Sequence, residues 1–246
     1  MKRIFAATLF IAGLSIISSS AFAQSESRDD VLKQIEIKRA ELAVLEKQIL
    51  QPSEQDRLAY TDFLSQPKTG IVRLMPREKY DDNAYKDMKK PSVTIRGGGA
   101  FYSFSRDSHD YNSGSPEILL ERGQLSVGFA GGDYGILTTL GDVPVEQITI
   151  EHPSVRFLAE YSVPKEELDA RSEGMRFWKG VTFGGGTFKR QAPAAVDVTY
   201  ALRSINLVGR GVLVVFKVVR QDGDGSVTLV WKQLKTYDKP KFARSN

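Results

Sequence analysis

The sequence predicts an α+β protein: an N-terminal helical arm, then one mainly antiparallel β domain that is sandwich-like or a rolled sheet and contains two short helices. Two observations predict this class. Apolar residues recur at helical spacing over a long stretch near the N-terminus, and later runs of β-branched and aromatic residues alternate with Gly-rich turns. We assign residues 24–66 to the arm, 67–236 to the β domain and 237–246 to a polar C-terminal tail.

Residues 1–23 have the pattern of an export signal. Lys2 and Arg3 form a basic start, an apolar run covers 4–17, and the tripeptide Ala-Phe-Ala at 21–23 is an A-x-A cleavage site. We therefore expect cleavage between Ala23 and Gln24 and a periplasmic or extracellular mature protein. No second long apolar run follows, so we expect no membrane span in the mature chain.

Composition excludes several classes of function. The chain has no cysteine, so disulfides, thiol catalysis, cysteine metal sites and a lipid anchor on cysteine are excluded. Removal of Lys2 and Arg3 lowers the formal net charge from +4 to +2. This near balance gives no electrostatic case for a nucleic-acid partner.

The arm begins with a helix predicted over 27–50. Ser27, followed three residues later by Asp30, resembles a capping box. An apolar seam then occupies near-heptad positions, interrupted once at Lys38: Val31, Ile35, Leu42, Leu45 and Ile49. Such a seam either packs on the protein's own domain or mediates self-association or partner binding. Pro52 ends this helix, and Ser53 caps a second one.

The β domain is a succession of short strands and turns. We predict strands at 70–75, 92–95, 100–104, 117–120, 124–130, 136–140, 147–150, 181–183 and 187–189. Two helices are predicted to start near Pro153 and Pro164. Apolar alternation from 196 to 207 changes frame, which predicts a β-bulge near Arg203 and Ser204.

A hairpin with arms at 212–219 and 227–234 is the strongest strand signal. Its first arm is apolar on both faces as far as Phe216, which predicts a central strand. A loop closed on Gly223-Asp224, or a four-residue loop from Asp222 to Gly225, sets a register in which Phe216 lies opposite Trp231. A three-residue bulged turn would slip the register by one and place Trp231 opposite Lys217. Together with the strand before it, the hairpin is expected to form a three-stranded antiparallel meander.

Several blocks resemble a family of bacterial secreted proteins. They are TGIVRLMPRE at 69–78, RGGGAFYSF at 96–104, LSVGFAG at 125–131, LGDVP at 140–144 and the closing hairpin. The resemblance covers roughly residues 69–236 and leaves the arm outside. It implies no activity, ligand or catalytic residue.

Two glycine-rich patterns imitate ligand loops. The triplets at 97–99 and 184–186 have the composition of a phosphate cradle, but no helical pattern follows either one. The segment 222–225 begins like a calcium loop, yet Ser226, Val227 and Gln233 occupy positions where an EF-hand needs a ligand, Gly and Glu. We interpret all three as structural turns, so no metal site and no cofactor are predicted.

The polar loop 105–112 is the candidate binding region. Loops on a rigid β scaffold commonly carry binding residues. We therefore name five candidate ligand-binding residues: Arg106, His109, Asp110, Tyr111 and Asp133. Because the loop lacks aliphatic side chains, we expect His109 at the surface, where its removal leaves the fold intact.

The leading hypothesis is a non-enzymatic, exported envelope or extracellular protein with a binding or structural role. The alternative is a secreted hydrolase with His109 as base, beside Asp107 or Asp110 and with Ser105 or Ser108 as nucleophile. No Gly-x-Ser-x-Gly elbow is present, and no catalytic residue is assigned.

Further carboxylates and aromatic residues lie near turns around the same strands. Paired carboxylates can hydrolyse glycosides, and aromatic rings can stack on sugars. The candidates are Glu117, Glu121, Asp133 and Asp142, with Phe101, Tyr102, Phe104, Tyr111 and Tyr134. A pocket shared by His109 and two or more carboxylates would favour the hydrolase over the binding protein.

We expect the exported protein to begin at Gln24, because the A-x-A site directly follows a short apolar run. N-terminal sequencing of protein recovered from the periplasm or medium is the measurement. Recovery of a chain that still carries Met1 would contradict the predicted export signal.

Overall fold

The computed structural model describes residues 27–81, 95–109, 116–129 and 132–243. It divides into two compact units, Met1–Leu42 and Ala43–Asn246. The predicted export signal and residues 92–94 of one predicted strand lie outside the described residues. Within the described ranges, no helix combines the length and apolarity needed to cross a membrane.

Helix α1 (Arg28–Leu50) begins in the first unit, and its last eight residues belong to the second. The backbone N–H of Asp30 donates to Ser27 Oγ at 3.3 Å, which confirms the predicted cap. Three seam residues in the first unit, Val31, Ile35 and Leu42, are each 40% exposed.

The second unit contains two larger sheets and a small hairpin, and all paired strands are antiparallel. A five-stranded sheet has the order β1 (Thr69–Leu74), β11 (Val227–Tyr237), β10 (Gly211–Gln221), β9 (Thr199–Asn206), β5 (Asp133–Gly141). A four-stranded sheet has the order β2 (Phe101–Tyr102), β3 (Ile118–Glu121), β4 (Gln124–Ser126), β8 (Gln191–Pro193). The small hairpin pairs β6 (Val181–Phe183) with β7 (Gly186–Phe188).

Short helices complete the second unit. They are α2 (Glu54–Ala59), α3 (Thr61–Leu64), α4 (Arg77–Tyr80), α6 (Pro153–Glu160) and α7 (Glu167–Lys179), with a 3₁₀ turn η1 (Val145–Gln147). Ser53 caps α2, since its Oγ accepts from the backbone N–H of Asp56 at 3.1 Å. The arrangement confirms the predicted α+β class.

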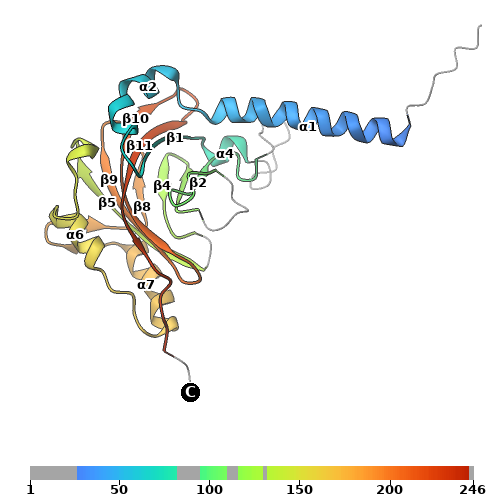
Figure 1. Cartoon of the computed structure of the whole chain (residues 1–246). Helices are drawn as coiled ribbons and strands as arrows, with labels where there is room; N and C mark the ends of the chain where they lie inside the picture. Colours follow the sequence, from blue (N-terminus) through green and yellow to red (C-terminus); the bar gives the residue numbers. More distant parts are fainter. Residues whose placement is uncertain (1–26, 82–94, 110–115, 130–131, 244–246) are drawn as a thin grey trace, which may run out of the picture. The chain divides into compact units, whose positions relative to one another are not determined.

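The five-stranded sheet lies between the helices α6 and α7 and the four-stranded sheet (Figure 1). Each of its faces carries a hydrophobic core. One core packs the sheet against the four-stranded sheet and includes Phe104, Leu120, Phe216 and Trp231. The other packs it against α6 and α7 and includes Leu158 and Phe177. The result is a layer of helices, a central sheet and a second sheet.

The closing hairpin forms the centre of this sheet. Phe216 pairs with Trp231, as predicted, and β10 lies between β9 and β11 in the predicted meander. Close to the turn the register is shifted by one residue, with Gln221 opposite Val227. A bulge between Val218 and Arg220 absorbs the shift, so Phe216 still meets Trp231.

Three local predictions are wrong. Residues 147–150 form no strand, because the chain turns through η1 and then enters α6. The second helix starts at Glu167, well after Pro164. No bulge occurs at Arg203 and Ser204, whose pairing with both neighbouring strands is continuous. The bulge was predicted from the change of frame in the apolar alternation. Because β9 is buried on both faces, its polar residues do not mark a solvent side, and the change of frame carries no information about a bulge.

We expect Trp231→Ala to lower the free energy of unfolding by about 3–5 kcal/mol, as large aromatic truncations in cores do. Trp231 is 4% exposed, and its indole is so close to Gly70 that a Cβ there would lie 2.5 Å from the ring. Urea denaturation measures the loss, with Trp178→Ala as control because Trp178 is 53% exposed. Equal losses in the two variants would contradict the assigned core position.

Candidate functional site

A pocket of about 940 Å³ lies in the second unit, beside β1 and the loop that follows β2. The last turns of α1 and the start of α2 form its other walls. Its lining includes Ala43, Glu46, Lys47, Leu50, Arg57, Leu64, Gly70, Ile71, Val72, Ile95, Arg96, Tyr102, Asp107, Ser108 and His109. Apolar walls with a few convergent polar groups are typical of sites for small organic ligands.

His109 is half-buried in this pocket, so the expectation of a surface residue is wrong. Its Nδ1 lies 2.9 Å from the carbonyl oxygen of Phe101, and its ring contacts the edge of Tyr102 at 5.3 Å between centroids. Two backbone hydrogen bonds between Ser103 and Ser108 fold the loop inward and carry His109 to the strand. The loop has no aliphatic side chain, so the apolar surface that covers His109 comes from the Tyr102 ring.

The surroundings of His109 determine its chemical form. Burial lowers its pKa below the ordinary value of 6.5, although the Phe101 carbonyl and Asp107 oppose the shift. Because a carbonyl only accepts, Nδ1 must carry the proton of the neutral ring. Nε2 therefore has a free lone pair, which can accept a hydrogen bond or take a proton.

Tyr102 and Asp107 form a second polar pair of the pocket. The Tyr102 hydroxyl donates to Asp107 Oδ1, and Asp107 adopts a positive φ of 49°. Burial, aided by this carboxylate, raises the pKa of Tyr102, so its hydroxyl keeps its proton. Behind Tyr102 lies the buried indole N–H of Trp231, with 6.2 Å between the ring centroids.

Charged residues from the helices and from the segment before β2 complete the lining. Glu46 is buried near the end of α1, whereas Lys47, Arg57 and Arg96 are exposed. Sequence reasoning missed Glu46, Lys47 and Arg57 because it treated the arm and the β domain separately. The residue pattern contains no signal that would connect Arg57 with His109.

The five predicted site residues do not converge. His109 lies in the pocket, but Arg106 belongs to another depression of about 470 Å³, shared with Glu117 and Arg210. Asp133 starts β5, and its charge acts on Arg190. Asp110 and Tyr111 lie outside the described residues.

The other carboxylates considered for glycoside hydrolysis have structural contacts. Glu117 is buried and accepts from Ser105 Oγ at 2.6 Å, and burial raises its pKa. Glu121 pairs with Arg77 at 3.3 Å, and Asp142 pairs with Lys217 at 2.7 Å. Their partners differ, so these carboxylates do not form one catalytic pair.

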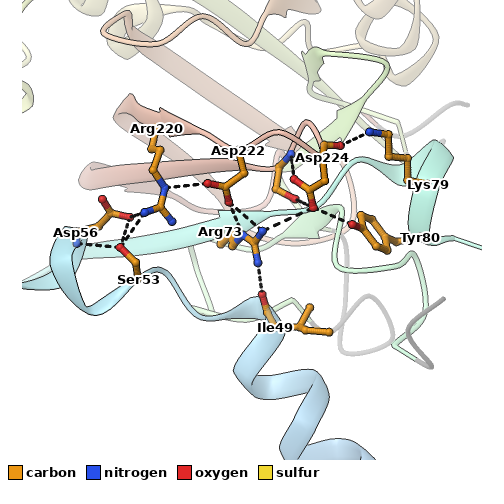
Figure 2. A network of polar contacts seen from close by, with 10 residues as sticks. Ile49, Ser53, Asp56, Arg73, Lys79, Tyr80, Arg220, Asp222 and Asp224 are labelled. Atoms are coloured by element: carbon orange, nitrogen blue, oxygen red, sulfur yellow. Dashed lines mark hydrogen bonds and ion pairs between the residues drawn. The ribbon is translucent and has the colours of Figure 1, made fainter. Parts of the chain in front are cut away.

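The calcium-like segment is a hairpin turn neutralised by arginines (Figure 2). Asp222 pairs with Arg73 at 2.9 Å and with Arg220 at 3.0 Å. Asp224 accepts from the backbone N–H of Ser226 at 2.8 Å and from the Tyr80 hydroxyl at 2.7 Å. Burial alone would raise the pKa of Asp224, but these hydrogen bonds and the charge of Arg73 hold it below its ordinary value.

The two arginines also connect this turn to the helices that line the pocket. Arg73 donates to the carbonyl oxygen of Ile49 at 2.8 Å, and Arg220 pairs with Asp56 at 2.9 Å (Figure 2). The end of α1 and the start of α2 are thereby held against the hairpin tip. The turn thus helps to build the pocket wall.

The glycine triplets are turns. Residues 97–99 all have positive φ, and a Cβ on Gly98 would lie 2.5 Å from the carbonyl oxygen of Tyr80. The triplet therefore allows close approach of two backbone segments and leads into β2. Residues 184 and 185 also have positive φ and connect β6 to β7.

No cluster of three or more His, Asp or Glu suited to a metal ion occurs in the part of the chain that the structure describes. The chain matches no protein-family model, no curated protein and no solved structure. The resemblance to bacterial secreted proteins therefore stays a prediction, and the pocket has to be interpreted from its own chemistry.

We expect the protein to lose stability as the pH falls below about 6.5, partly through His109. The folded state holds the His109 pKa below 6.5, so the unfolded chain binds a proton more readily over this range. His109→Gln should remove this part of the pH dependence, whereas His152→Gln, at the other histidine, should retain it.

Urea denaturation of the three proteins at about pH 5 and about pH 7.5 measures the effect. His109→Ala should also cost about 1–2 kcal/mol at the higher pH, because the hydrogen bond to Phe101 is lost. The same pH dependence in wild type and His109→Gln would contradict the buried neutral form.

Proposed function

We propose that this protein is an exported, non-enzymatic binding protein whose pocket beside β1 takes a small organic ligand. The observation that carries the proposal is the pocket itself: about 940 Å³, with apolar walls around the neutral, half-buried imidazole of His109. A volume near this value is typical of sites for drug-sized molecules.

The lining indicates the chemistry of the ligand. Leu50, Ile71 and Val72 offer apolar contacts, and the buried Tyr102 side chain contributes to the pocket wall. Among the lining side chains that the structure describes, three cations, Lys47, Arg57 and Arg96, outnumber the two carboxylates, Glu46 and Asp107. A ligand with an apolar or aromatic body and one anionic group fits this combination.

The probe 8-anilinonaphthalene-1-sulfonate combines an aromatic body with one sulfonate. We expect calorimetric titration to show one saturable site on the folded protein. Ala43 is an exposed helical residue that lines the pocket, so Ala43→Trp should fill space and weaken binding about tenfold or more, a loss of about 1.4 kcal/mol.

The matched control is Val44→Trp, because Val44 is exposed on the same helix but does not line the pocket. This variant should bind the probe as the wild type does. Equal affinity in Ala43→Trp and Val44→Trp would place the probe elsewhere and contradict the proposed site.

One observation favours a hydrolase as the second candidate function. His109, with its free Nε2, shares the pocket with two carboxylates, Asp107 and Glu46, and with Ser108. Two observations oppose the hydrolase. Asp107 already accepts a hydrogen bond from Tyr102, and Glu46 also has an interaction partner. Hydrolysis of ester or glycoside substrates that disappears in a stably folded His109→Gln would favour this candidate over the binding protein.

We further propose that the arm pairs two copies of the chain through its apolar seam. The support is the heptad spacing of Ile35 and Leu42 and their exposure of 40% each. Light scattering should give a dimer mass for the wild-type mature chain and a monomer mass for the double variant Ile35→Asp, Leu42→Asp.

Two other exposed apolar residues provide the control. Ile37 and Val44 are also seven positions apart but lie on the opposite side of the same helix. The double variant Ile37→Asp, Val44→Asp should keep the wild-type mass. A monomeric wild type, or equal masses for the two double variants, would contradict pairing through the seam.

A further inference from the structure

Arg203 is a buried cation in the middle of the central sheet. It lies on β9 opposite Ile136 on one neighbouring strand and Leu213 on the other, and it is 4% exposed. Its two cross-strand neighbours belong to the core that the sheet forms with α6 and α7. A guanidinium in such apolar surroundings is costly unless something compensates its charge.

The protein supplies little compensation. No carboxylate lies within ion-pair distance of Arg203 among the described residues. Its guanidinium stacks on the Tyr237 ring, 3.0 Å from the ring centroid. Nη1 donates to the carbonyl oxygen of Ser204 at 3.3 Å, and Nε is buried with no hydrogen-bond partner in the described structure.

Nearby groups are neutral hydroxyls. The Tyr134 and Tyr161 hydroxyls lie 3.0 Å apart. Tyr161 donates to the Glu173 carboxylate at 2.8 Å, so this carboxylate bonds a tyrosine hydroxyl and not Arg203. Burial lowers the pKa of Arg203 to about 10, which still leaves it a cation at neutral pH. Its positive charge therefore lacks a matching anion.

Arg203 lines a pocket of about 270 Å³ between β9 and the segment after β11. A Cβ placed on Gly211, another lining residue, would lie 3.2 Å from Arg203 Nη1, so the guanidinium lies at the pocket wall. Lys241 brings a second cation, and Asn206 adds an amide. Asp238 is the one carboxylate among the lining residues that the structure describes; it lies 3.9 Å from Arg210, and its side chain is 95% exposed.

We propose that this pocket binds a small oxyanion, a phosphate or carboxylate group, between the Arg203 guanidinium and the Lys241 ammonium. An oxyanion accepts hydrogen bonds from a guanidinium and matches its charge. The site is distinct from the pocket around His109, with which it shares no lining residue. Its small volume suits a single anionic group.

The test is the melting temperature of the mature chain in inorganic phosphate, in acetate and in sodium chloride of equal ionic strength. Ligands that bind only the folded state raise the melting temperature. At a concentration about ten times the Kd, we expect a rise of about 3–5 °C over the chloride reference. A rise in phosphate alone would show that the pocket selects a tetrahedral anion. A rise in acetate as well would show that it binds oxyanions in general.

Two neighbouring lysines provide matched variants. Lys241→Ala should at least halve the rise, whereas Lys239→Ala should keep it, because Lys239 is exposed and does not line the pocket. Arg203→Met should abolish the rise. If that buried variant fails to fold, the lysine pair still decides the outcome.

Two results would overturn the proposal. One is a wild-type melting temperature that is the same in phosphate, acetate and chloride. The other is a rise retained in Lys241→Ala to the same extent as in Lys239→Ala, or retained in a folded Arg203→Met, since the anion would then bind elsewhere.

Discussion

Burial of both faces of β10 is the constraint on which the rest of the structure depends. Its even-numbered residues from Val212 to Val218 face the four-stranded sheet, and its odd-numbered residues Leu213 and Val215 face the helices. Phe216 stacks on Tyr200 at 5.1 Å and on Phe104 at 6.0 Å, so one side chain joins the two sheets. Because neither face can tolerate water, the elements on both sides have to close over this strand.

The hairpin that contains β10 also organises the pocket around His109. At its core, Trp231 packs against Gly70 and lies behind Tyr102, so the pocket wall rests on the hydrophobic core. At its tip, Asp222 pairs with Arg73 and Arg220, and Asp224 pairs with Arg73. Arg73 also binds the end of α1, and Arg220 binds the start of α2. A turn that resembles a calcium loop in sequence therefore serves as an anchor for helices.

The two pockets solve the burial of a basic side chain in different ways. His109 meets the cost of burial by staying neutral, which leaves a lone pair for a ligand. Arg203 cannot lose its proton at neutral pH, so it keeps its charge and relies on the Tyr237 ring. The first arrangement suits a ligand group that donates a hydrogen bond to Nε2 of His109, and the second suits an anion. The two pockets therefore differ in the chemistry that each could bind.

The sequence by itself determined the class of the fold and the capped start of α1, because both depend on local spacing and residue chemistry. The predicted Phe216–Trp231 pairing also occurs, but the turn lies one residue out of the predicted register, and the bulge between Val218 and Arg220 restores it. The predicted bulge at Arg203 and Ser204 is absent, because residue spacing does not reveal a solvent side in a strand that is buried on both faces. Only the tertiary structure decided which side chains share a site. His109 shares a pocket with Arg57, and Arg203 shares a pocket with Lys241, although the members of each pair are far apart in the chain. Which residues share a site depends on how the two sheets and the helices pack, and the spacing of residues along one strand does not predict that packing.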